Sequence, residues 1–186
     1  MKTDISDQIL YQDFLAGDLS AFDSIMSKYR TCLICFIQNY VKNWDVAEDL
    51  AQDVFVYLLV KKEPYDFKYS MKTYLFTIGK SRAINYLKKE KHIPLEDYHL
   101  TDHPSALQNQ IEEAVLTEER KQLLYQAIAR LKPNQRAAVF LADIEQLSTE
   151  ELCKTLEKSP SQAKMILYRA RKNLRKILEK EGLTNE

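Results

Sequence analysis

Residues 131–175 read LKPNQRAAVFLADIEQLSTEELCKTLEKSPSQAKMILYRARKNLR, and this stretch predicts a helix-turn-helix. Ser148 is followed three residues later by Glu151, which is the pattern of a capping box at a helix start. A second helix start follows at Ser159, with Pro160 at the first helical position and Gln162 three residues after the cap. Since only a short link separates the two predicted helices, the spacing fits the turn of a helix-turn-helix.

The second helix of this pair is strongly basic, which indicates a contact with duplex DNA. A helix fits the major groove, its amino-terminal residues reach base edges, and its cations meet phosphates. We therefore expect Gln162 to contact base edges and the later cations to contact phosphates. The candidate residues for duplex DNA are Ser161, Gln162, Lys164, Tyr168, Arg169, Arg171, Lys172 and Arg175.

Composition favours an all-α protein of the cytoplasm. Three Gly and five Pro among 186 residues favour long helices over a turn-rich β architecture. No apolar run approaches the roughly 18 residues that a membrane helix needs, and the polar start of the chain lacks the pattern of a secretory signal. Three Cys cannot form a disulfide framework, so we expect a cytoplasmic compartment.

The net charge of zero conceals two basic blocks. Residues 64–92 carry 7 cationic against 2 anionic side chains, and residues 160–186 carry 7 against 3. Charge runs are often solvated helix faces, but one of these blocks lies inside the helix-turn-helix. Two basic blocks separated by acidic sequence therefore indicate two nucleic-acid contacts on one chain.

The first half of the chain predicts consecutive helices. One opens at Asp18 and continues as an apolar run to Val41, so we expect it to be buried on several sides. The next helix should be capped by Asp45 and end at Pro64, and a further helix should span residues 71–91.

A stretch of weak periodicity divides the chain. Residues 93–110 contain two Pro with scattered Asp and His, which predicts a flexible linker. We therefore place one domain at residues 1–92 and a second at residues 111–186. The predicted fold is all-α, with two small helical domains joined by this linker, the second containing the helix-turn-helix.

Two features of the first domain suggest binding surfaces. Asp49, Gln52 and Asp53 share a helix face, which is either a docking site or a solvated acidic surface. Residues 65–91 interleave aromatic and cationic side chains, as single-stranded DNA binders do, because bases stack on aromatic rings while cations follow phosphates. The candidate residues for this strand are Phe67, Lys68, Tyr69, Lys72, Lys80 and Arg82, whereas Phe76 and Ile78 are expected in the core.

No motif of a catalytic or metal site is evident. The chain lacks a Gly-rich phosphate loop, HExxH and GxSxG. Cys32 and Cys35 form a CxxC, but their apolar surroundings favour buried thiols over metal ligands. His99 and His103 lie four residues apart, but Pro104 and the polar context argue against a metal site on a helix. We expect no enzyme activity, no metal and no cofactor.

Six motifs occur in order along the chain: DLSAF (18–22), AEDLAQDVF (47–55), KTYLFTIGKSRAINYLKK (72–89), LKP (131–133), LSTEEL (147–152) and YRAR (168–171). This series resembles the extracytoplasmic-function sigma factors, the small two-domain initiation subunits of bacterial RNA polymerase. The resemblance covers nearly the whole chain, with a linker where the family has one.

The resemblance implies a sigma factor that directs promoter-specific initiation. Its first domain would bind core RNA polymerase through Glu48, Asp49, Gln52 and Asp53, which would dock on a coiled coil of the largest subunit. The turn at Phe67–Ser70 would capture an extruded base of the −10 element from the melted non-template strand. The helix-turn-helix would bind the double-stranded −35 element, and an anti-sigma factor would be a further partner.

Some positions depart from the pattern of that family. The family usually has Trp at Tyr74, Asn at Ser81, Gly at Glu157, and a common Ser-Arg pair at Met165-Ile166. These differences concern the promoter sequence rather than the fold. The alternative is a helix-turn-helix regulator that does not bind core polymerase, which would leave the aromatic and basic segment without a role.

Overall fold

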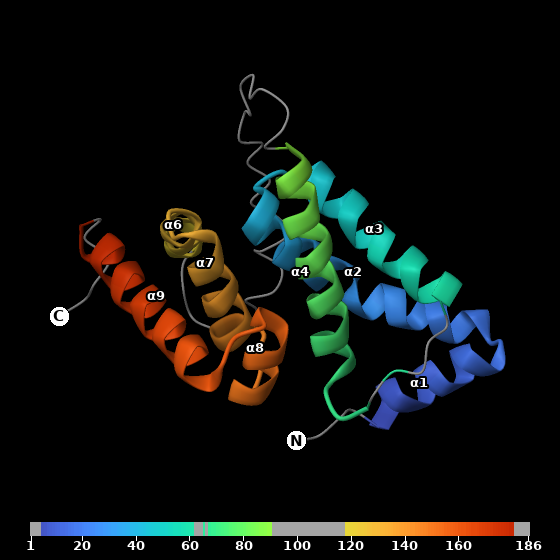
Figure 1. Cartoon of the computed structure of the whole chain (residues 1–186). Coiled ribbons are helices and arrows are strands. Elements are labelled where there is room, and N and C mark those ends of the chain that lie inside the picture. Colours follow the sequence, from blue (N-terminus) through green and yellow to red (C-terminus); the bar gives the residue numbers. More distant parts are fainter. Residues whose placement is uncertain (1–4, 62–64, 66, 91–117, 181–186) are drawn as a thin grey trace. The chain divides into compact units, whose positions relative to one another are not determined.

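The structure is a computed structural model in which residues 5–61, 65, 67–90 and 118–180 are described. These residues form helices joined by short turns, without strands, and the chain divides into two compact units between Leu100 and Thr101. Figure 1 shows α1 to α4 in blue to green and α6 to α9 in yellow to red. The predicted class, an all-α protein of two helical domains, is confirmed. The linker predicted at residues 93–110 lies outside the described residues, as do the three His.

The first unit is built around one buried helix. Its helices are α1 (Ile5–Ala16), α2 (Leu19–Val41), α3 (Trp44–Lys61) and α4 (Met71–Glu90). The other three helices all pack against α2, so its second half is buried almost without interruption. Cys32 and Cys35 lie in this buried half, which confirms that they are buried thiols.

Helix starts in the first unit follow local capping, with one departure from the prediction. The Asp18 carboxylate accepts hydrogen bonds from the Ser20 backbone and hydroxyl at 2.8 and 2.7 Å, and these bonds lower the pKa of Asp18. The predicted cap at Asp45 was wrong: α3 starts at Trp44, and the Asn43 side chain accepts from the Val46 backbone at 3.1 Å.

Helix α1 was not predicted, and a buried polar contact joins it to α2. Asp7 is 4% exposed, accepts a hydrogen bond from the Tyr29 hydroxyl and pairs with Lys28 at 2.7 Å. Tyr11 and Phe14, one turn apart, bury the apolar face of α1.

The second unit consists of short helices packed on one long helix. The elements are α6 (Glu118–Ala129), α7 (Pro133–Val139), the π-helix η1 (Phe140–Ile144), α8 (Thr149–Leu156) and α9 (Pro160–Lys180). The core joins α6, α7 and α9 through Ile128, Val139 and Ala170. Arg136 is 3% exposed and donates to the Ala129 carbonyl at 2.7 Å, which ties α7 to the end of α6. No helix in the described part of the chain is both long and apolar enough to cross a membrane.

Candidate nucleic-acid interface

The helix-turn-helix is fixed by two reciprocal caps. The Ser148 hydroxyl accepts from the Glu151 backbone at 3.3 Å, and the Glu151 carboxylate accepts from the Ser148 backbone at 3.1 Å. The Ser159 hydroxyl likewise accepts from the Gln162 backbone at 3.3 Å, while Gln162 Oε1 accepts from the Ser159 backbone at 3.2 Å. Both predicted helix starts are confirmed, and these bonds satisfy backbone donors that helix starts leave without partners.

One residue in the turn adopts an unusual backbone conformation. Glu157 ends α8 in the left-handed region, at a φ of 54°, and its backbone amide donates to carbonyls at the end of α8. This reversal lets α9 begin only a few residues later, at Pro160.

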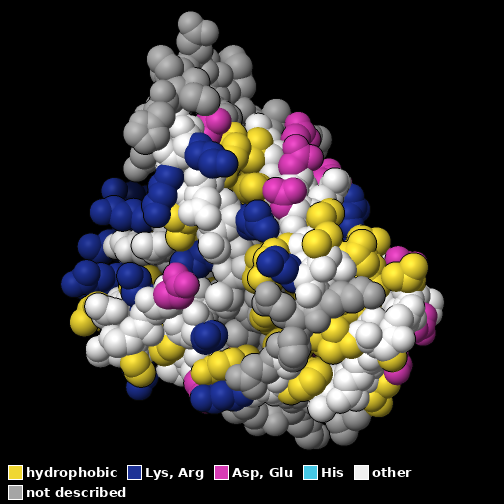
Figure 2. All heavy atoms as spheres, turned by 45° about the vertical axis from the view of Figure 1, so that its right-hand side comes forward, with side chains coloured by type: hydrophobic (Ala, Val, Ile, Leu, Met, Phe, Trp, Pro, Cys, Tyr) yellow, Lys and Arg dark blue, Asp and Glu magenta, His cyan; other side chains and the backbone are white. Residues whose placement is uncertain are grey.

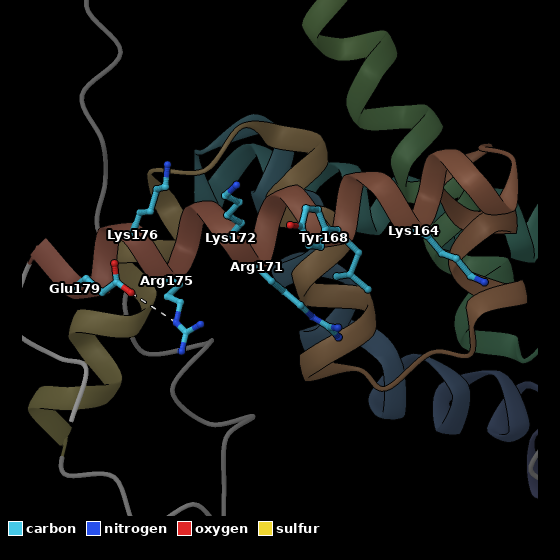
Figure 3. A pocket seen from close by; sticks show the side chains of 8 residues that line it. Lys164, Tyr168, Arg171, Lys172, Arg175, Lys176 and Glu179 are labelled. Atoms are coloured by element: carbon cyan, nitrogen blue, oxygen red, sulfur yellow. Dashed lines mark ion pairs between the residues drawn. The ribbon is translucent and has the colours of Figure 1, made fainter. Parts of the chain in front are cut away.

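Helix α9 has a core face and a charged face. Ala163 and Ala170, seven residues apart, are fully buried against the unit, so the opposite face is exposed. Figure 3 shows Lys164, Tyr168, Arg171, Lys172, Arg175 and Lys176 projecting from α9 around a shallow pocket. Every candidate residue for duplex DNA is exposed: Ser161, Gln162, Lys164, Tyr168, Arg169, Arg171, Lys172 and Arg175.

Two of these cations have partners within the unit. The Arg171 guanidinium binds the Asp143 carboxylate of η1 with two hydrogen bonds, of 2.5 and 3.2 Å. Hydrogen bonding to Asp143 raises the pKa of Arg171 above its usual value. Arg175 pairs with Glu179 one turn away at 3.6 Å, shown by the dashed line in Figure 3. Arg171 thus secures α9 to η1 in addition to facing solvent.

The remaining cations of this surface face solvent. Lys164, Arg169 and Lys172 are exposed, and none of them forms an ion pair with another residue that the structure describes. Such cations can meet phosphates without first breaking an internal pair. They are therefore the strongest phosphate contacts among the candidates.

The turn before α4 holds three aromatic residues, Tyr65, Phe67 and Tyr69, and one exposed cation, Lys68; we call it the aromatic turn. Tyr65 is buried and its hydroxyl donates to the Tyr69 carbonyl, which closes the turn. Phe67 is half-buried, with its ring edge-on to Tyr65 at a centroid distance of 4.8 Å. Lys68 is exposed and its Nζ lies 5.3 Å from the centre of the Tyr69 ring. The turn therefore places two half-buried aromatic rings, Phe67 and Tyr69, beside an exposed cation.

The candidates on α4 are placed differently from one another. Lys72 is half-buried, and the Arg82 guanidinium, also half-buried, lies 5.6 Å from the centre of the Tyr57 ring on α3. Lys80 is only 6% exposed, so a DNA strand cannot reach it in this conformation. The signal was in the sequence, because helical spacing places Lys80 on the same face as Phe76 and Ala83, which are both fully buried.

The exposed stripe of α3 extends further along the helix than the sequence predicts. Asp49, Gln52 and Asp53 are exposed, whereas Glu48 is half-buried and its carboxylate pairs with Arg30 of α2. Val56 and Val60, which sequence reasoning missed, stand 56% and 72% exposed one and two turns further along the same stripe.

We define this docking stripe as Asp49, Gln52, Asp53, Val56 and Val60. Its spacing of three and four residues was visible in the sequence, but exposure depends on how α3 packs. Figure 2 shows that exposed hydrophobic side chains lie among charged ones on the surface it draws. An exposed pair of apolar side chains beside acidic ones is typical of a surface that binds another protein.

Comparison with known proteins gives two family matches in chain order. Residues 25–93 match Sigma-70 region 2, and residues 121–174 match Sigma-70, region 4. A probable RNA polymerase sigma factor of Haemophilus influenzae is 29% identical over 178 residues, spanning 86% of this chain and 90% of that protein. The ECF RNA polymerase sigma factor SigM of Bacillus subtilis is 27% identical over 165 residues, spanning 88% of this chain and 98% of that protein.

Solved structures share the fold. CnrH in complex with the cytosolic domain of CnrY gives a TM-score of 0.67 at 18% identity, covering 94% of this chain and 97% of that one. The sigma factor RpoE in complex with the anti-sigma factor NepR, from Bartonella quintana, gives 0.66 at 22% identity, covering 85% and 96%. Two sigma regions in the right order, relatives aligned over almost their full length and a shared fold lead to one conclusion: the chain belongs to the extracytoplasmic-function family of RNA polymerase sigma factors.

Proposed function

We propose that this sigma factor binds core RNA polymerase through the docking stripe of α3 and directs it to promoters whose upstream duplex is read by α9. The observation that carries the proposal is the exposed, cationic face of α9 directly after two reciprocal caps. The two caps fix where α8 and α9 begin. The cations of α9 then supply the attraction to phosphates that positions a helix in a groove.

The docking stripe supplies the contact with polymerase in this proposal. Val56 and Val60 would add apolar contact area at one end of the stripe, because a partner that covers them removes their side chains from water. Asp49 and Asp53 would pair with cations of the partner and set the orientation.

The aromatic turn would hold the melted non-template strand. Capturing a base that opens thermally costs a few kcal/mol for unpairing. Stacking on one aromatic ring returns about 1–3 kcal/mol per base. Phe67 and Tyr69 could therefore offset the cost of one or two open bases, with Lys68, Lys72 and Arg82 near the phosphates.

We further propose that the chain works in the cytoplasm as an initiation factor with no catalysis of its own, and that an anti-sigma factor controls it. The support for an anti-sigma partner is that the RpoE neighbour was solved with one. In this proposal, the signal that frees this chain would act on the anti-sigma factor and not on the chain itself.

Transcription in vitro with purified core polymerase on a genomic library tests the proposal. Adding this chain should yield specific start sites that core enzyme alone does not use. A regulator of the helix-turn-helix class would bind DNA without binding core enzyme, so failure to form a complex with core enzyme would favour that alternative.

The docking stripe gives the first mutational prediction. Asp49→Arg with Gln52→Arg should weaken the affinity for core enzyme at least about tenfold, because the two arginines would repel the cations of the partner. Fluorescence anisotropy of the labelled chain measures the affinity. Gln12→Arg with Asp13→Arg, the same changes at exposed positions of α1, is the matched control. Equal affinity of both variants would contradict the assignment of the stripe.

A further inference from the structure

Helix α9 carries two large apolar side chains on its exposed face. Met165 is 48% exposed and Tyr168 is 62% exposed, and among the described residues of the second unit they are the large hydrophobic side chains that stand in solvent. One helical turn apart, they form a small apolar patch rimmed by charged side chains, and such patches are typical of binding sites.

These side chains form the centre line of the DNA-facing surface. Ser161, Met165, Tyr168 and Lys172 are separated by four, three and four residues, so they form one stripe along α9. Cations without an ion pair among the described residues border the stripe on both sides, Lys164 on one and Arg169 on the other. With the flanking cations on the phosphates of the two groove walls, the centre line faces base edges.

Met165 lies in the second turn of α9, in the amino-terminal part that reaches deepest into a groove. The apolar group in the major groove is the 5-methyl group of thymine, since cytosine carries only a hydrogen at the same ring carbon. A methionine side chain is flexible and polarisable, so it can close over a single methyl group.

We propose that Met165 is a specificity-determining residue that recognises the methyl group of a thymine in the upstream promoter element. The inference rests on the proposed function, because it requires α9 in the major groove. Burial of one methyl group should favour thymine by about fourfold in affinity. The preference belongs to Met165 and is independent of the phosphate contacts of its neighbours.

Replacing thymine by deoxyuridine removes only this methyl group and keeps the base pair. The test uses holoenzyme, assembled from the full chain and core polymerase, on a promoter obtained from the transcription library. Each upstream thymine is changed singly to deoxyuridine and the affinity is measured. We expect one position at which the change weakens binding by about fourfold, and at that position Met165→Ala holoenzyme should bind both duplexes equally.

Two further variants keep the result specific. Met165→Leu should retain the preference for thymine, because leucine can still cover the methyl group. Lys164→Ala should lower the affinity for both duplexes and retain their ratio, because it removes a phosphate contact. Met165 is exposed, so neither of its variants disturbs the core.

Two outcomes overturn the inference separately from the proposed function. If holoenzyme protects the upstream duplex but no deoxyuridine changes its affinity, Met165 does not read thymine. The same follows if Met165→Ala keeps the fourfold penalty at the same position. If holoenzyme does not protect the upstream duplex at all, the proposed role of α9 fails, and this inference fails with it.

Discussion

Glu157 shows how a single residue limits the stability of the helix-turn-helix. Its φ of 54° lies in the left-handed region, where a side chain costs roughly 1–2 kcal/mol that glycine avoids. The turn therefore forms despite its residue, and packing of α8 and α9 supplies the difference.

We predict that Glu157→Gly stabilises the second unit by about 1 kcal/mol. Urea denaturation followed by circular dichroism measures this change. Lys158→Gly is the control: its φ is not in the left-handed region, so glycine should bring only the entropic cost of a more flexible unfolded chain. Equal effects of the two substitutions would show that the conformation of Glu157 carries no strain.

Residue placement could be predicted from the sequence where it depends on near neighbours. Both reciprocal caps were correct because each needs only two residues three positions apart. Lys80 was misjudged because its charge outweighed the helical spacing that buries it. The partner of Arg171, Asp143, lies 28 residues away, and no local pattern predicts a contact at that separation.

Gly79 sets the distance between two helices of the first unit. A Cβ at this position would lie 2.9 Å from Leu33 Cδ1 and 3.3 Å from Ile37, both fully buried on α2. One turn earlier, Phe76 stacks on Phe36 with ring centroids 4.6 Å apart. The absence of a side chain at Gly79 thus allows the close approach that packs these rings.

We predict that Gly79→Val destabilises the first unit by about 2 kcal/mol, because overpacking outweighs the better helix propensity. Thermal unfolding followed by circular dichroism gives the change. Ser81→Val introduces the same β-branched side chain at an exposed position of α4 and should leave the melting temperature nearly unaltered. If both variants melt alike, α4 has room to move away from α2.

Helices were predicted well where the sequence carried both a capping residue and a helical spacing of apolar side chains. Helix α2 has both, and its burial on several sides followed from its unbroken apolar run. Helix α1 was missed because its inward side includes Asp7, which reads as a surface residue unless its partners Lys28 and Tyr29 are known. The π-helix η1 has no sequence signal of its own, since it continues directly from α7.

At the scale of the whole molecule, the sequence predicted the all-α class and the presence of two units. Scarce glycine and proline were sufficient for the class, and the loss of periodicity after α4 marked the division. Packing partners were not predictable in this way, because they depend on contacts between distant residues. We propose that the domains span residues 1–92 and 111–186, with a linker at 93–110.

We predict that limited proteolysis cleaves first within residues 93–110 and leaves two protected fragments. Buried helices resist cleavage because they must unfold before a protease can bind them. Mass spectrometry of the early fragments locates the cuts. First cleavage within residues 45–60 or 148–175 would contradict this division of the chain.

The basic face of α9 belongs to a molecule whose net charge is zero. Beyond a Debye length of about 8 Å at physiological salt, a neutral molecule exerts almost no pull on a polyanion. The pull of α9 on DNA is therefore local: its basic face acts within about a Debye length of the phosphates, and the molecule as a whole adds no long-range attraction. We expect the free chain to find DNA slowly, and an assembled complex with polymerase to search the genome at a rate set by the larger partner.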